Sequence, residues 1–131
     1  MTPYLLDANV LIALTVREHE HHERASAWCA EISAFALCPV VEGALLRFLL
    51  RMGESARTGQ QIVRDVLAHP KARFWADDIS YATVGLGDLR GHRQVTDVYL
   101  AALAAGHGGM LATLDESLAA LRPSQTLLIP R

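Results

Sequence analysis

The chain has 131 residues, of which 51% are hydrophobic and 20% charged, and its formal net charge is −2 at pH 7. This composition excludes a disordered or fibrous protein, and no apolar run approaches the roughly 20 residues that a membrane span needs. The length predicts one domain over residues 1–131. Because the N-terminus lacks the basic and apolar regions of a secretory signal, we expect a cytoplasmic protein with no membrane partner.

The first group of predicted elements comprises five short apolar runs, which are too brief for helices and read as strands. Their continuous hydrophobicity is typical of a parallel sheet that is covered on both faces. The runs are Tyr4–Leu6, Phe35–Cys38, Arg73–Trp75, Met110–Leu114 and Thr126–Ile129.

Between the strands, apolar residues recur at helical spacing. We expect the helix over Ala44–Met52 to end at Gly53 and the helix over Ile62–Leu67 to end before Pro70. The helix over Val95–Leu103 should end in the run Gly106–Gly109. Strands that alternate with helices predict an α/β fold with helices on both sides of the sheet. The stripes run from Ala25 to Ile32, Ala44 to Met52, Ile62 to Leu67 and Val95 to Leu103.

Cys29 and Cys38 are the only cysteines. Two residues provide no disulfide framework and no Cys-x-x-Cys metal site. Cys29 lies on a helical stripe and Cys38 near the end of a strand, so we expect both to be buried, reduced and inert.

Four carboxylates are predicted to meet at one edge of the sheet. Asp7 follows the first strand and Asp115 follows the fourth, whereas Glu42 and Asp97 lie in the first turns of helices that start at that edge. The carboxyl ends of parallel strands share an edge, and open α/β sheets place their ligands there.

Each of these acids also has a simpler structural interpretation, which a single residue does not exclude. Glu42 could be an exposed residue favoured by the helix dipole. The others could cap helices or stabilise turns, as could two polar neighbours. The residues concerned are Asp7, Asn9, Thr96, Asp97 and Asp115.

Electrostatics predicts a metal among the four acids. Two carboxylates about 4 Å apart repel by roughly 4 kcal/mol at an effective dielectric constant of about 20. Either some of them stay protonated or a cation lies between them, and oxygen ligands suit Mg²⁺ or Mn²⁺.

The negative net charge at first argues against a nucleic-acid partner. Without the four acids, however, 12 basic and 10 acidic residues remain, so the rest of the molecule carries a net positive charge.

The acids lie in segments that resemble a known family. The run Leu5–Ile12 (LLDANVLI) resembles the opening motif of PIN domains, especially the ribonuclease toxins of VapBC toxin–antitoxin pairs. Glu42 resembles their second acidic position, Val95–Ala104 (VTDVYLAALA) the helix with the third, and Leu111–Asp115 (LATLD) the strand that delivers the fourth. The similarity spans nearly the whole chain in the usual order.

The resemblance implies a PIN-like α/β/α sandwich with a central parallel sheet of about five strands. It also implies a metal-dependent endoribonuclease, a homodimer, and inhibition by a VapB-type antitoxin that offers a basic side chain to the acids. The expected RNA products carry a 5′-phosphate and a 3′-hydroxyl. One departure is that Glu116-Ser117 follow Asp115, where the family often has a basic residue and another Asp.

Within such a site we expect Asp7, Asp97 and Asp115 to ligate the metal, and Glu42 to act directly or through a water. Smaller polar groups would orient a ligand or water, or else only cap and bond the backbone. A basic loop before the Asp97 helix would contact RNA phosphates, or else be simply solvated. The polar groups are Asn9, Thr96 and Thr113, and the basic loop contains Arg90, His92 and Arg93.

Two rival functions and one rival metal site compete with this interpretation. An aspartate-nucleophile phosphatase usually has a second Asp two residues on, where this chain has Asn9, and a lysine near the site, whereas Lys71 is the only one. A PIN-like binding module that has lost its metal would have little reason to keep four acids. His19, His21 and His22 invite a metal interpretation, but we expect them to be solvated side chains.

Overall fold

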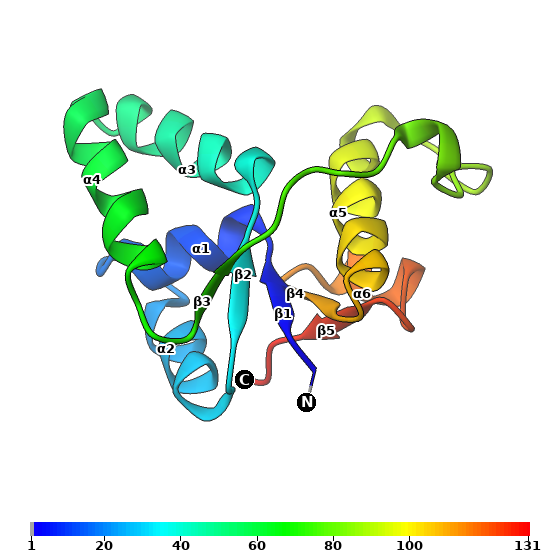
Figure 1. The fold of residues 1–131 in the computed structure, drawn as a ribbon, viewed down its shortest axis with the longest axis horizontal. Coiled ribbons are helices and arrows are strands. Elements are labelled where there is room, and N and C mark those ends of the chain that lie inside the picture. Colours follow the sequence, from blue (N-terminus) through cyan, green and yellow to red (C-terminus); the bar gives the residue numbers. More distant parts are fainter. Residues whose placement is uncertain (1) are drawn as a thin grey trace.

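The structure is a computed structural model that describes residues 2–131. Helices and strands alternate along most of the chain (Figure 1). The strands are β1 (Tyr4–Leu6), β2 (Phe35–Leu37), β3 (Ala72–Phe74), β4 (Met110–Thr113) and β5 (Thr126–Leu128). The helices are α1 (Ala8–Thr15), α2 (His22–Glu31), α3 (Pro39–Arg51), α4 (Ala56–Leu67), α5 (Val95–Gly106) and α6 (Glu116–Leu121).

The five strands form one parallel sheet in the order β3-β2-β1-β4-β5. Helices α1 to α4 lie on one side of it, whereas α5 and α6 lie on the other (Figure 1). This arrangement confirms the predicted α/β/α sandwich. From β1 the chain adds β2 and β3 on one side and then crosses to β4 on the other. The strand order therefore reverses at β1, which is where such sheets bind their ligands.

The sheet's centre carries the core. In β1, β2 and β4, Leu5, Leu37 and Leu111 are fully buried, as are Leu45 of α3 and Leu103 of α5. A sheet with helices on both faces buries both sets of alternating side chains, so these strands read as unbroken apolar runs.

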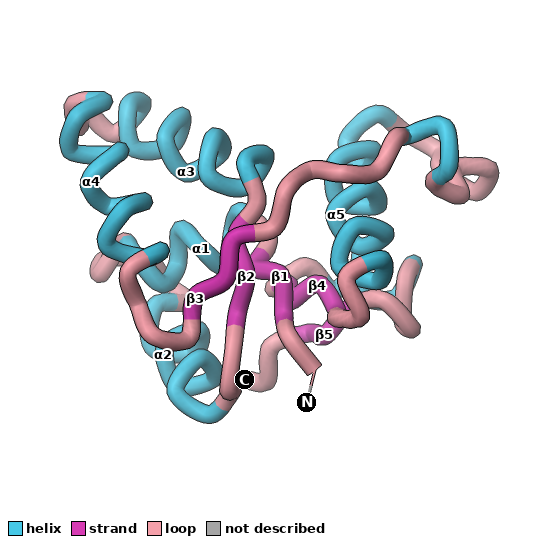
Figure 2. Tube along the Cα trace, in the orientation of Figure 1, coloured by secondary structure: helices cyan, strands magenta, loops and turns pink. Residues whose placement is uncertain are grey.

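Strand β3 contradicts the prediction of continuous burial. It pairs only with β2, at the edge of the sheet, and Arg73 and Phe74 are exposed. Its bounds also lie one residue before the predicted run, because Trp75 already begins the long connection to α5. That connection crosses the top of the molecule as an extended loop with two short 3₁₀ turns, Tyr81–Thr83 and His92–Gln94 (Figure 2).

Two other predicted core positions are wrong. Met52 is 66% exposed because α3 ends at Arg51 and Gly53, with φ of 94°, turns the chain away. Cys29 is only half-buried, whereas Cys38 is fully buried and burial raises the pKa of its thiol to about 12. Both thiols are free. Within residues 2–131, no helix is long and apolar enough to cross a membrane.

Candidate active site

Asp7 lies at the reversal point, between β1 and α1. It is the N-cap of α1, and its Oδ1 accepts a hydrogen bond from the Val10 N–H at 2.9 Å. Its own N–H donates to the Ala112 carbonyl at 3.1 Å, so β4 fixes its position as well. Asp7 is 4% exposed, and it is the one buried ionisable carboxylate in the described part of the chain. The capping role predicted for Asn9 therefore belongs to Asp7, and Asn9 is an exposed residue inside α1.

Asp115 lies beside β4 and is the N-cap of α6. Its Oδ1 accepts from the N–H groups of Ser117 and Leu118 at 2.9 and 3.1 Å. The fully buried Thr113 hydroxyl accepts from the Asp115 N–H at 3.0 Å and also hydrogen-bonds to Asp7. Thr113 thus connects the two acids that follow β1 and β4.

Asp97 comes from the other side of the sheet, in the first turn of α5. The N-cap of this helix is Gln94, which makes no side-chain capping bond. The capping interpretation of Asp97 and Thr96 is therefore wrong. Asp97 is half-buried and Thr96 exposed.

These three acids lie close enough for their charges to interact. The pKa of Asp7 is raised to about 6, mainly by burial and to a smaller extent by the charges of Asp97 and Asp115, against hydrogen bonds from Thr113 and Val10 that lower it. The pKa of Asp97 is raised by burial and then by the charge of Asp115. The structure therefore brings three of the four predicted acids together.

Glu42 has a different neighbour. It lies half-buried in the first turn of α3, and burial followed by the charge of Asp77 raises its pKa. Glu42 Oε2 and Asp77 Oδ1 are both buried without a hydrogen-bond partner. Asp77, on the connection after β3, was not predicted from the sequence, because no pattern there distinguishes it from the adjacent Asp78.

The donor set fits a hard divalent cation. A desolvated carboxylate facing two others, together with unpartnered carboxylate oxygens nearby, is stabilised by positive charge more than by any neutral group. Among residues 2–131, however, no three acidic, histidine or cysteine side chains already stand in a metal-holding arrangement. The acids would therefore have to draw closer around an ion.

The remaining predicted residues lie around this edge with different surroundings. The basic loop is exposed, with His92 and Arg93 in the 3₁₀ turn that leads into α5. The histidines of the predicted run are partly solvated, because His19, His21 and His22 are all half-buried. His22 Nδ1 lies 2.8 Å from the Ala13 carbonyl and ties the turn to α1.

Comparison with known proteins decides the family. The PIN domain family model matches residues 4–122. Ribonuclease VapC29 of Mycobacterium tuberculosis is 50% identical over 127 residues, which cover 96% of each chain. The chain belongs to the VapC family of PIN-domain ribonucleases. The VapC39 ribonuclease of the same organism is 34% identical over 125 residues, 88% of this chain and 90% of the relative.

Solved VapC structures share the fold. VapBC2 from Rickettsia felis, bound to a DNA fragment from its promoter, matches with a TM-score of 0.67 at 13% identity, over 96% of this chain and 98% of that one. VapC20 of M. tuberculosis, a toxin that cleaves the sarcin-ricin loop, matches with a TM-score of 0.68 at 15% identity, over 90% and 94%. VapC ribonucleases of the PIN family are metal-dependent, which agrees with the carboxylate donor set.

Proposed function

We propose that the chain is the toxin of a VapBC pair, a cytoplasmic endoribonuclease that forms one domain over residues 1–131. It hydrolyses RNA phosphodiesters with Mg²⁺ or Mn²⁺ held by Asp7, Glu42, Asp97 and Asp115. The observation that carries the proposal is the buried Asp7 carboxylate, which faces Asp97 and Asp115 although burial, and then the charges of these two acids, raise its pKa to about 6. An arrangement that disfavours its own ionised state is expected where a cation completes it.

Each acid has a separate task in this proposal. A cation held by these acids would lower the pKa of a water and offset the negative charge on the phosphate. Asp7 and Asp115 are held as N-caps, and Thr113 aligns them. Asp97 approaches from α5. Glu42 lies half-buried beside Asp77, and its Oε2, which has no hydrogen-bond partner, would reach the cation through a water and accept that water's proton.

The partners follow from the family and from the surface charges. We propose an RNA substrate, a VapB-type antitoxin as inhibitor and a homodimer as the working form. An antitoxin that offers a basic side chain to the acids would remove the repulsion that a metal otherwise removes. Asn9 and Thr96, both exposed at this edge, would orient water or ligand.

The direct test is cleavage of single-stranded RNA with Mg²⁺ or Mn²⁺, and with EDTA. We expect cleavage only with the metal, and a loss of more than about a hundredfold in each of the variants Asp7→Asn, Glu42→Gln, Asp97→Asn and Asp115→Asn, because even residues that only support a metal ligand cost about 10- to 100-fold. Asp65→Asn, an exposed carboxylate on α4, is the matched control. Cleavage that survives EDTA would contradict the metal-dependent mechanism, and RNA binding without cleavage would favour the metal-free binding module.

The exposed basic loop that contains Arg90, His92 and Arg93 leads to a second prediction. If Arg90 and Arg93 contact phosphates, their replacement by alanine lowers RNA affinity. The slope of the logarithm of the binding constant against the logarithm of the salt concentration then becomes shallower by about 1.4, the value for two single-strand phosphate contacts. Fluorescence anisotropy across a range of salt concentrations measures both. Arg57→Ala, an exposed arginine on α4, is the control. An unchanged slope in the double variant would leave the loop merely solvated.

A further inference from the structure

We propose that a groove beside Asp115 binds one unpaired nucleobase of the substrate, next to the bond that is cut. This histidine groove has a volume of about 370 Å³ and lies between the turn that precedes α2 and the start of α6. The inference rests on the proposed function and adds to it a determinant of RNA sequence. The groove is lined by Asn9, His19, Glu20, His21, Leu114 and Asp115.

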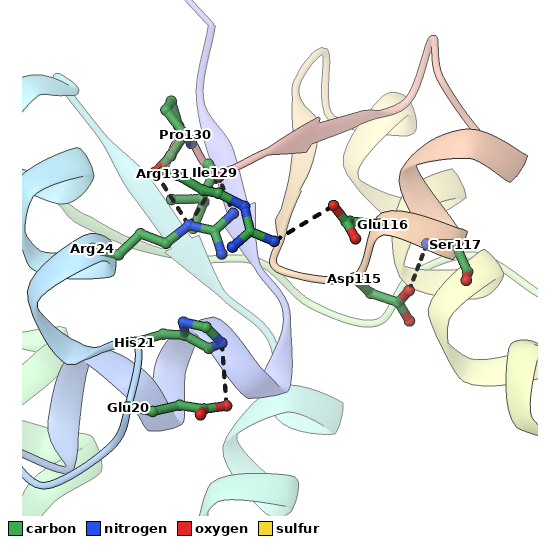
Figure 3. A network of polar contacts seen from close by, with 9 residues as sticks. All are labelled: Glu20, His21, Arg24, Asp115, Glu116, Ser117, Ile129, Pro130 and Arg131. Carbon is green, nitrogen blue, oxygen red and sulfur yellow. Dashed lines mark hydrogen bonds and ion pairs between the residues drawn. The ribbon is translucent and has the colours of Figure 1, made fainter.

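The groove is continuous with the candidate active site, because Asp115 and Asn9 belong to its lining. Glu20 and His21 lie on one side of the open space and Asp115 on the other (Figure 3). A strand whose phosphate reaches Asp115 must therefore place a neighbouring nucleotide against the histidine turn. The sequence did not reveal this, since His19 and His21 lie about 100 residues from Asp115 along the chain.

The two imidazoles are held in fixed orientations. His19 Nδ1 accepts a hydrogen bond from the His21 N–H at 3.0 Å, so the proton of the neutral His19 ring lies on Nε2. The ring centroids lie 5.7 Å apart with an interplanar angle of 45°. His21 Nε2 lies 3.3 Å from Glu20 Oε1. Rings that are already positioned lose little freedom when a ligand stacks on them.

The charges in the groove favour a base over a phosphate. Glu20 and Asp115 would repel a phosphate, whereas an imidazole face stacks on an unpaired base, the usual mode of sequence-specific RNA recognition. The Glu20 carboxylate is 82% exposed and accepts hydrogen bonds only. It therefore suits a base with an exocyclic amino group, as in adenine, cytosine or guanine, better than uracil.

The test measures binding of short single-stranded RNAs by fluorescence anisotropy, in EDTA so that no strand is cut. We expect His21→Ala to weaken binding about fivefold or more, as the loss of one stacked base does. Wild type should bind oligo(A) and oligo(C) more tightly than oligo(U). Glu20→Gln, an exposed and nearly isosteric change, should reduce that preference because an amide also donates to a carbonyl. His69→Ala, an exposed histidine after α4, is the matched control.

The outcomes separate the two proposals. In one outcome, wild type binds RNA and cuts it with Mn²⁺, and the His21 and Glu20 variants bind every oligonucleotide as wild type does. This result would overturn the proposed base-binding groove and leave the proposed ribonuclease function intact. Wild type that neither binds nor cuts RNA would overturn the proposed function and the groove together. A weaker His21→Ala variant with the wild-type base preference reduced in Glu20→Gln supports the groove.

Discussion

Replacing Asp7 by asparagine is expected to abolish RNA cleavage and, without metal, to make the protein more stable. Burial raises the Asp7 pKa from 3.8 to about 6, and a shift of about 2 units corresponds to about 3 kcal/mol of destabilisation at neutral pH. Asparagine has no charge to desolvate, and its carbonyl oxygen still accepts from the Val10 N–H. The gain in melting temperature should be on the order of 10 °C for a domain of this size.

The pH dependence of this gain has a defined sign. Between about pH 4 and pH 6 the folded wild type binds more protons than the unfolded chain, so its stability falls as pH rises through that window. The cost is complete above about pH 6 and absent below about pH 4. Asp7→Asn should therefore differ from wild type at neutral pH and match it in acid.

Chemical or thermal unfolding at neutral and acidic pH, with EDTA, measures both effects. Asp65→Asn is the control, because that carboxylate is exposed and pairs only with Gln61. An Asp7→Asn variant that is less stable than wild type at neutral pH would show that the carboxylate stabilises the fold as a helix cap and that its ionised form is not destabilised by burial.

Metal binding should compete with protons for Asp7. Since a ligand must be deprotonated before it binds a cation, the apparent Mn²⁺ affinity should fall about tenfold for each pH unit below about 6 and level off above it. Calorimetric titration across this range gives the affinity directly. Raising the Mn²⁺ concentration should move the acid limb of the cleavage profile to lower pH. If the acid limb of the pH profile of cleavage stays in place at every Mn²⁺ concentration, the group that titrates there is not part of the metal site.

Topology made three of the acids predictable. Asp7 and Asp115 follow adjacent strands, and α5 must begin at the same edge because it leads from β3 back to β4, so strand order alone places Asp97 near them. The unbroken apolar runs likewise predicted β1, β2 and β4, because both of their faces are covered. These conclusions depend on periodicity and on the geometry of parallel sheets, which a sequence expresses locally.

Other features depend on contacts that the sequence does not express. The exposure of β3 follows from its place at the edge of the sheet, and the apolar Phe74 and Trp75 give no sign of it. Asp77 reaches Glu42 through the path of an irregular connection, whose course is set by packing and not by a repeat. The turn of His19 and His21 is likewise fixed by hydrogen bonds to its own backbone and to α1.

The central claim is that these carboxylates hold a divalent cation, and thermal unfolding at neutral pH with EDTA and then with Mn²⁺ tests it most directly, on wild type and on Asp97→Asn. Asp97 caps no helix, so its replacement should leave the metal-free fold intact. Mn²⁺ at a hundred times its dissociation constant should stabilise wild type by about 2.7 kcal/mol, and the variant by much less. Melting curves that Mn²⁺ does not shift in wild type, or shifts equally in both proteins, would contradict the account.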